Sequence, residues 1–277
     1  MVVDRAFQQV DVFTTTPYLG NPVAVVLDGN DLSTEDMQRV ARWTNLSETT
    51  FVLPPTADGA DYRLRIFTPT QELPFAGHPT LGSCHAWLST LDGAAPDPVV
   101  QECAAGLVEI RRTAAGLAFA APPLVRSGAV EASLVEHLAD VLRIDRDEIV
   151  DAQWVDNGPG WVAALLESAE KVLALRPGGV DLDVGVVGPL PAGSAEAFEV
   201  RAFFPLNGAT AEDPVTCSLN AALAEWLLRT GRATSPYVAR QGTAIARAGR
   251  VHVMQEDDGR IWVGGGTVTC VRGHVDV

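Results

Sequence analysis

The sequence predicts an α+β protein of two similar halves, each a barrel-like, mostly antiparallel sheet wrapped around a central apolar helix. Strand-like segments with alternating apolar residues recur along the chain of 277 residues. Two helix-like segments, 80–91 and 216–230, are apolar on nearly every face and therefore belong in a core. Each of them follows a strand and a polar turn of the same design, so each half is organised around one buried helix.

The two strand–turn–helix segments are related in sequence. Residues 64–69 (L-R-I-F-T-P) match residues 200–205 (V-R-A-F-F-P), and residues 72–78 (E-L-P-F-A-G-H) match residues 212–218 (E-D-P-V-T-C-S). The start of a buried helix presents unpaired N–H groups and partial positive charge, which favour a carboxylate or phosphate. Two such turns facing each other would surround one pocket.

The first half is expected to be strand-rich. Ser33 with Asp36 three residues later predicts a capped helix over 34–43. The apolar helix at 80–91 follows the central turn. Strands are expected at 7–13, 23–27, 51–53, 62–67, 99–100, 106–111 and 117–120.

A linker is expected between the halves, where Pro122-Pro123 through Gly128 interrupts the pattern. The predicted domains are 1–122 and 129–277, with the final strand free to return to the first half. Helices are expected at 134–142 and 216–230, and 172–175 is ambiguous. Strands are expected at 152–155, 161–166, 197–204, 237–241, 245–248, 251–255 and 262–269.

Composition excludes several classes of function. A formal net charge of -15 argues against nucleic-acid and anionic-membrane partners, which require clustered positive charge. No apolar run reaches the roughly 20 residues that span a bilayer, and the first residues do not resemble a signal peptide, so a cytoplasmic protein is expected. The single lysine, Lys171, argues against Schiff-base chemistry. No metal site is expected from the cysteine and histidine spacings, and no glycine-rich nucleotide-binding loop occurs.

An ordered set of motifs resembles the PhzF family of phenazine-biosynthesis isomerase-like proteins. The resemblance spans nearly the whole chain and implies the fold of diaminopimelate epimerase. It also implies a homodimer, independence of cofactors, and proton transfer on a small carboxylate such as trans-2,3-dihydro-3-hydroxyanthranilate. The motifs are D-V-F at 11–13, G-N-P-V-A-V at 20–25, N-L-S-E-T at 45–49, F-T-P at 67–69, E-L-P-F-A-G-H-P-T-L-G at 72–82, E-D-P-V-T at 212–216 and Q-G at 241–242.

The resemblance also implies roles for particular residues. It places the catalytic glutamate at Glu48, with the histidine of the G-H-P turn at His78 and the aspartate of the second turn at Asp213. In a partly desolvated cleft, a raised pKa would let Glu48 take and return a proton. Without the resemblance, Glu48 would be a solvated turn residue and His78 a helix cap. Substrate-binding positions are implied at Gly77, Ser218, Thr216 and Asn21.

Cys217 departs from the family pattern, which has glycine in the second turn. Epimerases of this fold carry a cysteine in each turn, whereas this chain keeps Gly77 in the first. A thiol at a buried helix start should favour the thiolate, which would make Cys217 a base or nucleophile; alternatively, it only fills space. Leu219 replaces the usual small residue, which suggests a reshaped substrate pocket.

Three functions follow from these residues. The first is a cofactor-independent isomerase in which Glu48 shuttles the proton and His78 relays it. The second is an epimerase or lyase in which Cys217 and Glu48 act from opposite faces of the substrate. The third is a metabolite-binding protein that keeps the pocket without catalysis.

Overall fold

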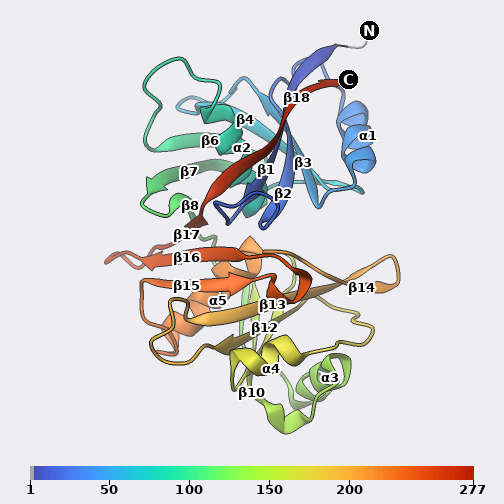
Figure 1. Cartoon of the computed structure of the whole chain (residues 1–277), viewed down its shortest axis with the longest axis vertical. Helices are drawn as coiled ribbons and strands as arrows, with labels where there is room; N and C mark the ends of the chain where they lie inside the picture. Colours follow the sequence, from blue (N-terminus) through green and yellow to red (C-terminus); the bar gives the residue numbers. More distant parts are fainter. Residues whose placement is uncertain (1–2) are drawn as a thin grey trace. The chain divides into compact units, whose positions relative to one another are not determined.

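The computed structural model describes residues 3–277 and divides them into two compact units (Figure 1). The first unit holds the described residues up to Ala120 together with Gly264–Val277, and the second holds Ala121–Val263. The chain therefore leaves the first unit next to the proline pair at 122–123 and re-enters it at Gly264. No helix among residues 3–277 is long and apolar enough to cross a bilayer.

The first unit is built on a series of neighbouring strands. All pairs are antiparallel except β2–β3 and β4–β6, which are parallel. Helix α1 (Thr34–Thr44) connects β2 to β3, and helix α2 (Gly77–Leu88) follows the short strand β5 (Glu72–Leu73), which also pairs with β4. The strands lie in the order β18 (Thr267–Asp276), β1 (Asp4–Val12), β2 (Asn21–Val26), β3 (Glu48–Leu53), β4 (Tyr62–Phe67), β6 (Val99–Cys103), β7 (Gly106–Thr113) and β8 (Gly116–Ala120).

The second unit repeats this order. Its parallel pairs are β11–β12 and β13–β15, and β14 (Ala209–Glu212) pairs with β13 as β5 pairs with β4. Helix α4 (Ala169–Ala174) connects β11 to β12, and helix α5 (Cys217–Arg229) follows β14. The strands lie in the order β9 (Arg126–Ala129), β10 (Ile149–Asp156), β11 (Val162–Leu166), β12 (Val184–Pro189), β13 (Phe198–Leu206), β15 (Tyr237–Gln241) and β16 (Gly249–Gln255).

Two segments of the second unit lie outside this repeat. Helix α3 (Ala132–Leu142) and a 3₁₀ turn at Arg146–Glu148 are inserted between β9 and β10. Strand β17 (Ile261–Gly265) carries the chain back to the first unit. Apart from these segments, each parallel pair is bridged by a helix and each long apolar helix follows a two-strand turn. The predicted fold of two similar α+β halves is confirmed.

The two apolar helices form the centres of their units, as their composition predicted. Gly82 of α2 lies so close to the sheet that a Cβ atom there would be 2.4 Å from Val23 Cγ1 of β2. On α5, Leu223 and Trp226 are essentially inaccessible and pack with residues of β11, β12 and β13. Both helices are drawn among the strands of their own unit in Figure 1.

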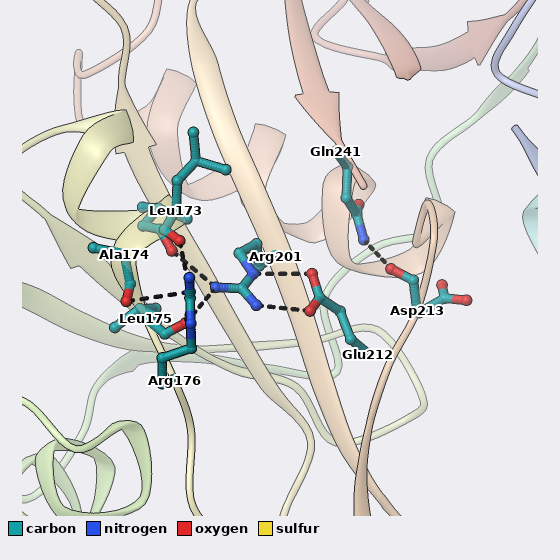
Figure 2. A network of polar contacts seen from close by, with 9 residues as sticks. Leu173, Ala174, Leu175, Arg176, Arg201, Glu212, Asp213 and Gln241 are labelled. Carbon is teal, nitrogen blue, oxygen red and sulfur yellow. Dashed lines mark hydrogen bonds and ion pairs between the residues drawn. The ribbon is translucent and has the colours of Figure 1, made fainter. Parts of the chain in front are cut away.

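The same ion pair fastens the turn in both units. Arg65 donates two hydrogen bonds of 2.7 Å to the carboxylate of Glu72. Arg201 does the same to Glu212, at 2.9 and 2.7 Å (Figure 2). It also donates to the carbonyl oxygens of Val172 and Leu175. Each arginine thus ties the strand before the turn to the short strand that enters it.

Four local expectations need correction. Helix α2 begins at Gly77 rather than Thr80. Pro79 is tolerated in the first turn because N–H groups there make no hydrogen bond within the helix, so the missing proline N–H costs nothing. The expected linker contains strand β9, which pairs with residues 153–156 of β10. The strand expected at 245–248 does not form: residues 243–245 make a 3₁₀ turn and the next strand begins at Gly249. Residues 262–269 are divided between β17 and β18.

Candidate functional site

Glu48 and His78 meet in the first unit. Glu48 is the first residue of β3, and His78 is the second residue of α2. The Oε2 atom of Glu48 lies 3.3 Å from Nε2 of His78, and the two side chains are only 15% and 7% exposed. The structure therefore brings Glu48, which lies outside both turns, together with His78 of the first turn, in surroundings largely shielded from water.

His78 is neutral at physiological pH. Burial lowers the pKa of its imidazole to about 4, although a hydrogen bond with the backbone of Pro22 opposes the shift. Proline has no N–H, so the imidazole must donate this bond to the Pro22 carbonyl. Nε2 has no hydrogen-bond partner within residues 3–277, so Nδ1 is the donor. The neutral ring therefore presents the lone pair of Nε2 to the Glu48 carboxyl group.

The turn before β2 is held by buried polar groups. Asp11 is 2% exposed, and its Oδ2 atom accepts a hydrogen bond of 3.1 Å from the Gly20 N–H. Asn21 begins β2, pairs with Val12 of β1 and has no exposed surface. Gly77, the first residue of α2, is also buried. The substrate contacts predicted for Asn21 and Gly77 stay predictions.

A buried amide organises the second turn. Gln241 has no exposed surface, and its Oε1 atom accepts hydrogen bonds from the Thr216 N–H (3.0 Å) and Asn220 Nδ2 (2.8 Å). Its Nε2 atom donates to the Asp213 carbonyl (3.1 Å; Figure 2) and to Thr216 Oγ1 (3.0 Å). Thr216 Oγ1 in turn donates to Asp213 Oδ2 at 2.6 Å. Gln241 therefore fixes both the backbone and, through Thr216, the carboxylate of Asp213.

Cys217 is the first residue of α5 and is 3% exposed. Burial raises the pKa of its thiol well above the ordinary value, and the nearby Asp213 carboxylate raises it further. The expected preference for the thiolate is therefore reversed, because desolvation acts against any charged form. This environment favours a small neutral residue that fills space at the helix start.

Ser218 is held by two residues that the sequence did not single out. The Trp161 indole N–H donates to Ser218 Oγ at 3.0 Å, and Asn157 Nδ2 donates to the Ser218 carbonyl at 2.9 Å. Both lie between β10 and β11, where 157–160 was predicted only as a turn and Trp161 only as the start of a strand. An N-G-P-G segment followed by a tryptophan was the available signal, but nothing in it pointed to a residue about sixty positions away.

Leu219 does not reshape a pocket. Its side chain has no exposed surface and packs in the core between α5 and the sheet. A Cβ atom on Gly185 of β12 would lie 2.3 Å from Leu219 Cδ1. Leu219 on α5 fits against the sheet because Gly185 on β12 has no side chain. The suggestion that Leu219 reshapes a substrate pocket is therefore wrong.

The predicted residues therefore form two groups. Glu48, His78 and Gly77 lie together in the first unit, and Asp213, Thr216, Cys217 and Ser218 lie together in the second. Within residues 3–277, no three histidine, cysteine or acidic side chains are clustered as metal ligands would be.

Comparison with known proteins extends the match beyond the two turns. The family model described as phenazine biosynthesis-like protein, PhzC-PhzF, matches residues 10–273. The chain is 35% identical to antisense-enhancing sequence 1 of Schizosaccharomyces pombe, over 98% of this chain and 99% of that protein. It is 34% identical to the trans-2,3-dihydro-3-hydroxyanthranilate isomerase of Pseudomonas fluorescens, over 96% and 97% of the two chains.

Solved structures show the same architecture. A phenazine biosynthesis protein of the PhzF family from Bacillus anthracis superposes with a TM-score of 0.84 at 22% identity, covering 99% of this chain and 100% of that one. This similarity shows the fold alone. The assignment to a family rests on the family model and on the relatives above. The chain belongs to the phenazine biosynthesis-like PhzC-PhzF family and is an isomerase.

Proposed function

We propose that the protein isomerises a small cyclic carboxylate of the trans-2,3-dihydro-3-hydroxyanthranilate type, with Glu48 as the proton carrier. The observation that supports this most directly is the 3.3 Å approach of Glu48 Oε2 to Nε2 of a neutral, buried His78. The relative from Pseudomonas fluorescens is named for this reaction.

The proposed chemistry is a proton transfer within one molecule. The Glu48 carboxylate takes a proton from a saturated ring carbon next to conjugated double bonds, and the electron pair of that C–H bond moves along the conjugated system. The same carboxyl group then returns the proton to another carbon of the system, so that nothing is consumed. Since side chains supply every step, we propose that the reaction needs no cofactor.

His78 stabilises the intermediate stage of this transfer. Its Nε2 lone pair accepts a hydrogen bond only when Glu48 carries the proton, because the other ring nitrogen already donates to Pro22. The proton is therefore held between two buried atoms rather than lost to solvent. His78 acts as an acceptor beside the base, and its own charge does not change.

The second turn supplies complementary binding groups. Asp213 is a hydrogen-bond acceptor fixed through Thr216 and Gln241, and Ser218 lies at the start of α5, where backbone N–H groups favour an anion. A substrate with an amino or hydroxyl donor next to a carboxylate fits this pair. We propose that the protein works in the cytoplasm as a homodimer.

The alternatives have weaker support. An epimerase or lyase that uses Cys217 requires a thiolate, which burial opposes at this position. A purely binding protein would not need a carboxyl group next to an uncharged imidazole. We therefore place Glu48, rather than Cys217, at the centre of the reaction.

The test is turnover of trans-2,3-dihydro-3-hydroxyanthranilate in D₂O, followed by proton NMR. We expect the wild type to move the double bonds and Glu48→Gln to lose roughly a thousandfold or more in kcat, as expected for removal of a general base with its positioning. Glu35→Gln, at an exposed position on α1, is the control and should keep full activity. Full turnover by Glu48→Gln would refute the mechanism.

A further inference from the structure

The turn between β10 and β11 contacts Ser218 twice and holds it from two sides. Trp161 is 4% exposed and donates its indole N–H to the Ser218 hydroxyl oxygen at 3.0 Å. Asn157 donates its amide to the Ser218 carbonyl at 2.9 Å. One contact thus fixes the side chain and the other fixes the backbone of the same residue.

The turn itself is rigidly built. A single oxygen of Asp156 accepts hydrogen bonds of 2.7 Å from both the Gly158 and the Gly160 N–H groups. Both glycines have positive φ, 138° and 99°, which other residues rarely adopt. The Val155 N–H donates to the Trp161 carbonyl at 3.0 Å and closes the turn. Trp161 therefore reaches Ser218 from a fixed support.

This arrangement gives the Ser218 hydroxyl a direction. An indole nitrogen can only donate, so the bond occupies a lone pair of Ser218 Oγ and leaves the hydroxyl hydrogen for another partner. A hydroxyl oriented in this way favours a hydrogen-bond acceptor, most strongly an anionic one. The start of α5 favours the same kind of group.

We infer that Trp161 is a positioning residue that fixes Ser218 as a hydrogen-bond donor to the carboxylate of the substrate. The inference rests on the proposed function for the identity of the site, and it adds the group that Ser218 recognises. Asn157 supports the same geometry through the backbone. The recognition of an acceptor by Ser218 therefore depends on the hydrogen bond from Trp161.

The first experiment measures binding by calorimetry with two probes, 3-hydroxyanthranilate and 2-aminophenol, which lacks the carboxylate. We expect Trp161→Phe and Ser218→Ala each to weaken binding of 3-hydroxyanthranilate by roughly tenfold, and to leave 2-aminophenol within about twofold. Trp161→Phe added to Ser218→Ala should cause no further loss, because both changes remove the same interaction. Equal weakening of both probes, or independent effects in the double variant, would overturn the inference.

Trp226→Phe is the matched control. Trp226 is fully buried in α5, and its indole nitrogen has no hydrogen-bond partner among residues 3–277. The same truncation there should lower the melting temperature without changing the affinity for 3-hydroxyanthranilate. A loss of affinity equal to that of Trp161→Phe would assign the effect to packing and contradict a positioning role.

A second measurement is independent of the ligand. In protein labelled with ¹⁵N-tryptophan, the Trp161 indole N–H should exchange slowly with solvent, and Ser218→Ala should remove that protection. An unchanged Trp161 signal would overturn the inference even if Glu48→Gln is inactive. If the signal responds but the wild type turns over no trans-2,3-dihydro-3-hydroxyanthranilate and binds neither probe, the positioning role stands and the proposed substrate falls.

Discussion

His78 and Glu48 share a single short approach, 3.3 Å between Nε2 and Oε2, while the other nitrogen of the imidazole donates to the Pro22 carbonyl. The arrangement leaves room for one proton between the two side chains. If that proton is present, Glu48 carries it, because the burial of His78 disfavours an imidazolium ion. The pair can therefore store a proton without creating a buried cation.

His78 should stay uncharged well into the acidic range. With a folded pKa of about 4 and an ordinary value of 6.5, His78 binds its proton more readily in the unfolded chain. The stability it contributes is full above pH 6.5 and is lost as the pH falls through this window. NMR of ¹⁵N-histidine should show the neutral Nδ1–H form of His78 at pH 5.5.

The same protein in urea provides the control for this titration. There all five histidines should titrate together near the ordinary value. A protonated His78 at pH 6 in the folded protein, or the opposite tautomer, would contradict both the burial argument and the hydrogen bond to Pro22.

The two arginine clamps should differ in their effect on stability. The Arg201 and Glu212 side chains are 6% and 12% exposed, whereas those of Arg65 and Glu72 are 17% and 34% exposed. Lysine cannot reproduce the paired hydrogen bonds or reach the Val172 and Leu175 carbonyls at the same time. We expect Arg201→Lys to cost about 2–4 kcal/mol and Arg65→Lys less than about 1 kcal/mol.

Urea unfolding followed by circular dichroism measures this difference. Because the two positions correspond in the internal repeat, each variant serves as the control for the other. Equal losses at both positions would show that burial does not determine the strength of these clamps.

Asp183 should limit stability at neutral pH. Burial and, to a smaller extent, the Asp156 carboxylate raise its pKa from 3.8 to about 6. A carboxyl group with a raised folded pKa contributes stability below its unfolded pKa and loses it as the pH rises through the folded value. We expect Asp183→Asn to stabilise the protein by about 1 kcal/mol at pH 8, a figure reduced from the full linkage value because the group is partly exposed, and to have little effect at pH 4.5.

Thermal melts at the two pH values provide the check. Asp181→Asn is the control, since a hydrogen bond with His137 lowers the pKa of Asp181 and predicts an effect of the opposite sign. A stabilisation by Asp183→Asn that is the same at pH 4.5 and pH 8 would exclude the charge as its cause.

Cys217 should be dispensable for catalysis. Its thiol is neutral and nearly inaccessible, so Cys217→Ala should keep kcat within about threefold and lose about 1–2 kcal/mol of stability from the small cavity. In the folded protein, iodoacetamide should label the more exposed Cys270 before Cys217. A variant that folds normally but loses activity by a hundredfold would restore the thiol to the mechanism.

The internal repeat in the sequence was enough to predict most of the fold. The match of residues 64–69 with 200–205 predicted two equivalent halves, and the structure places these segments in β4 and β13 with their helices in equivalent positions. Strand β12 escaped prediction because its sequence V-G-V-V-G-P contains two glycines and no clear alternation. The strand expected at 245–248 did not form, because a 3₁₀ helix begins after Gly242 and takes up residues 243–245.

The candidate site was predictable only in part. Glu48 and His78 were named from the resemblance. They are thirty positions apart in the chain, so the sequence alone did not predict that their side chains would be in contact. Trp161 and Gln241 act through hydrogen bonds to residues that are distant in the chain. Gln241 belongs to the Q-G motif, but the motif assigned it no role, and Trp161 was expected only as the start of a strand. Burial decided the state of Cys217, and a helix start alone had predicted the opposite direction for its pKa.

The pairing of β18 with β1 determines when the first unit can finish folding during synthesis. Strand β1 leaves the ribosome early, yet its partner is synthesised only after all of Ala121–Val263. The first unit therefore cannot be completed before the whole second unit has been made, and the outer edge of β1 remains open until the chain returns to it. A released chain truncated after residue 263 should already protect the second unit from protease and leave the first unit sensitive.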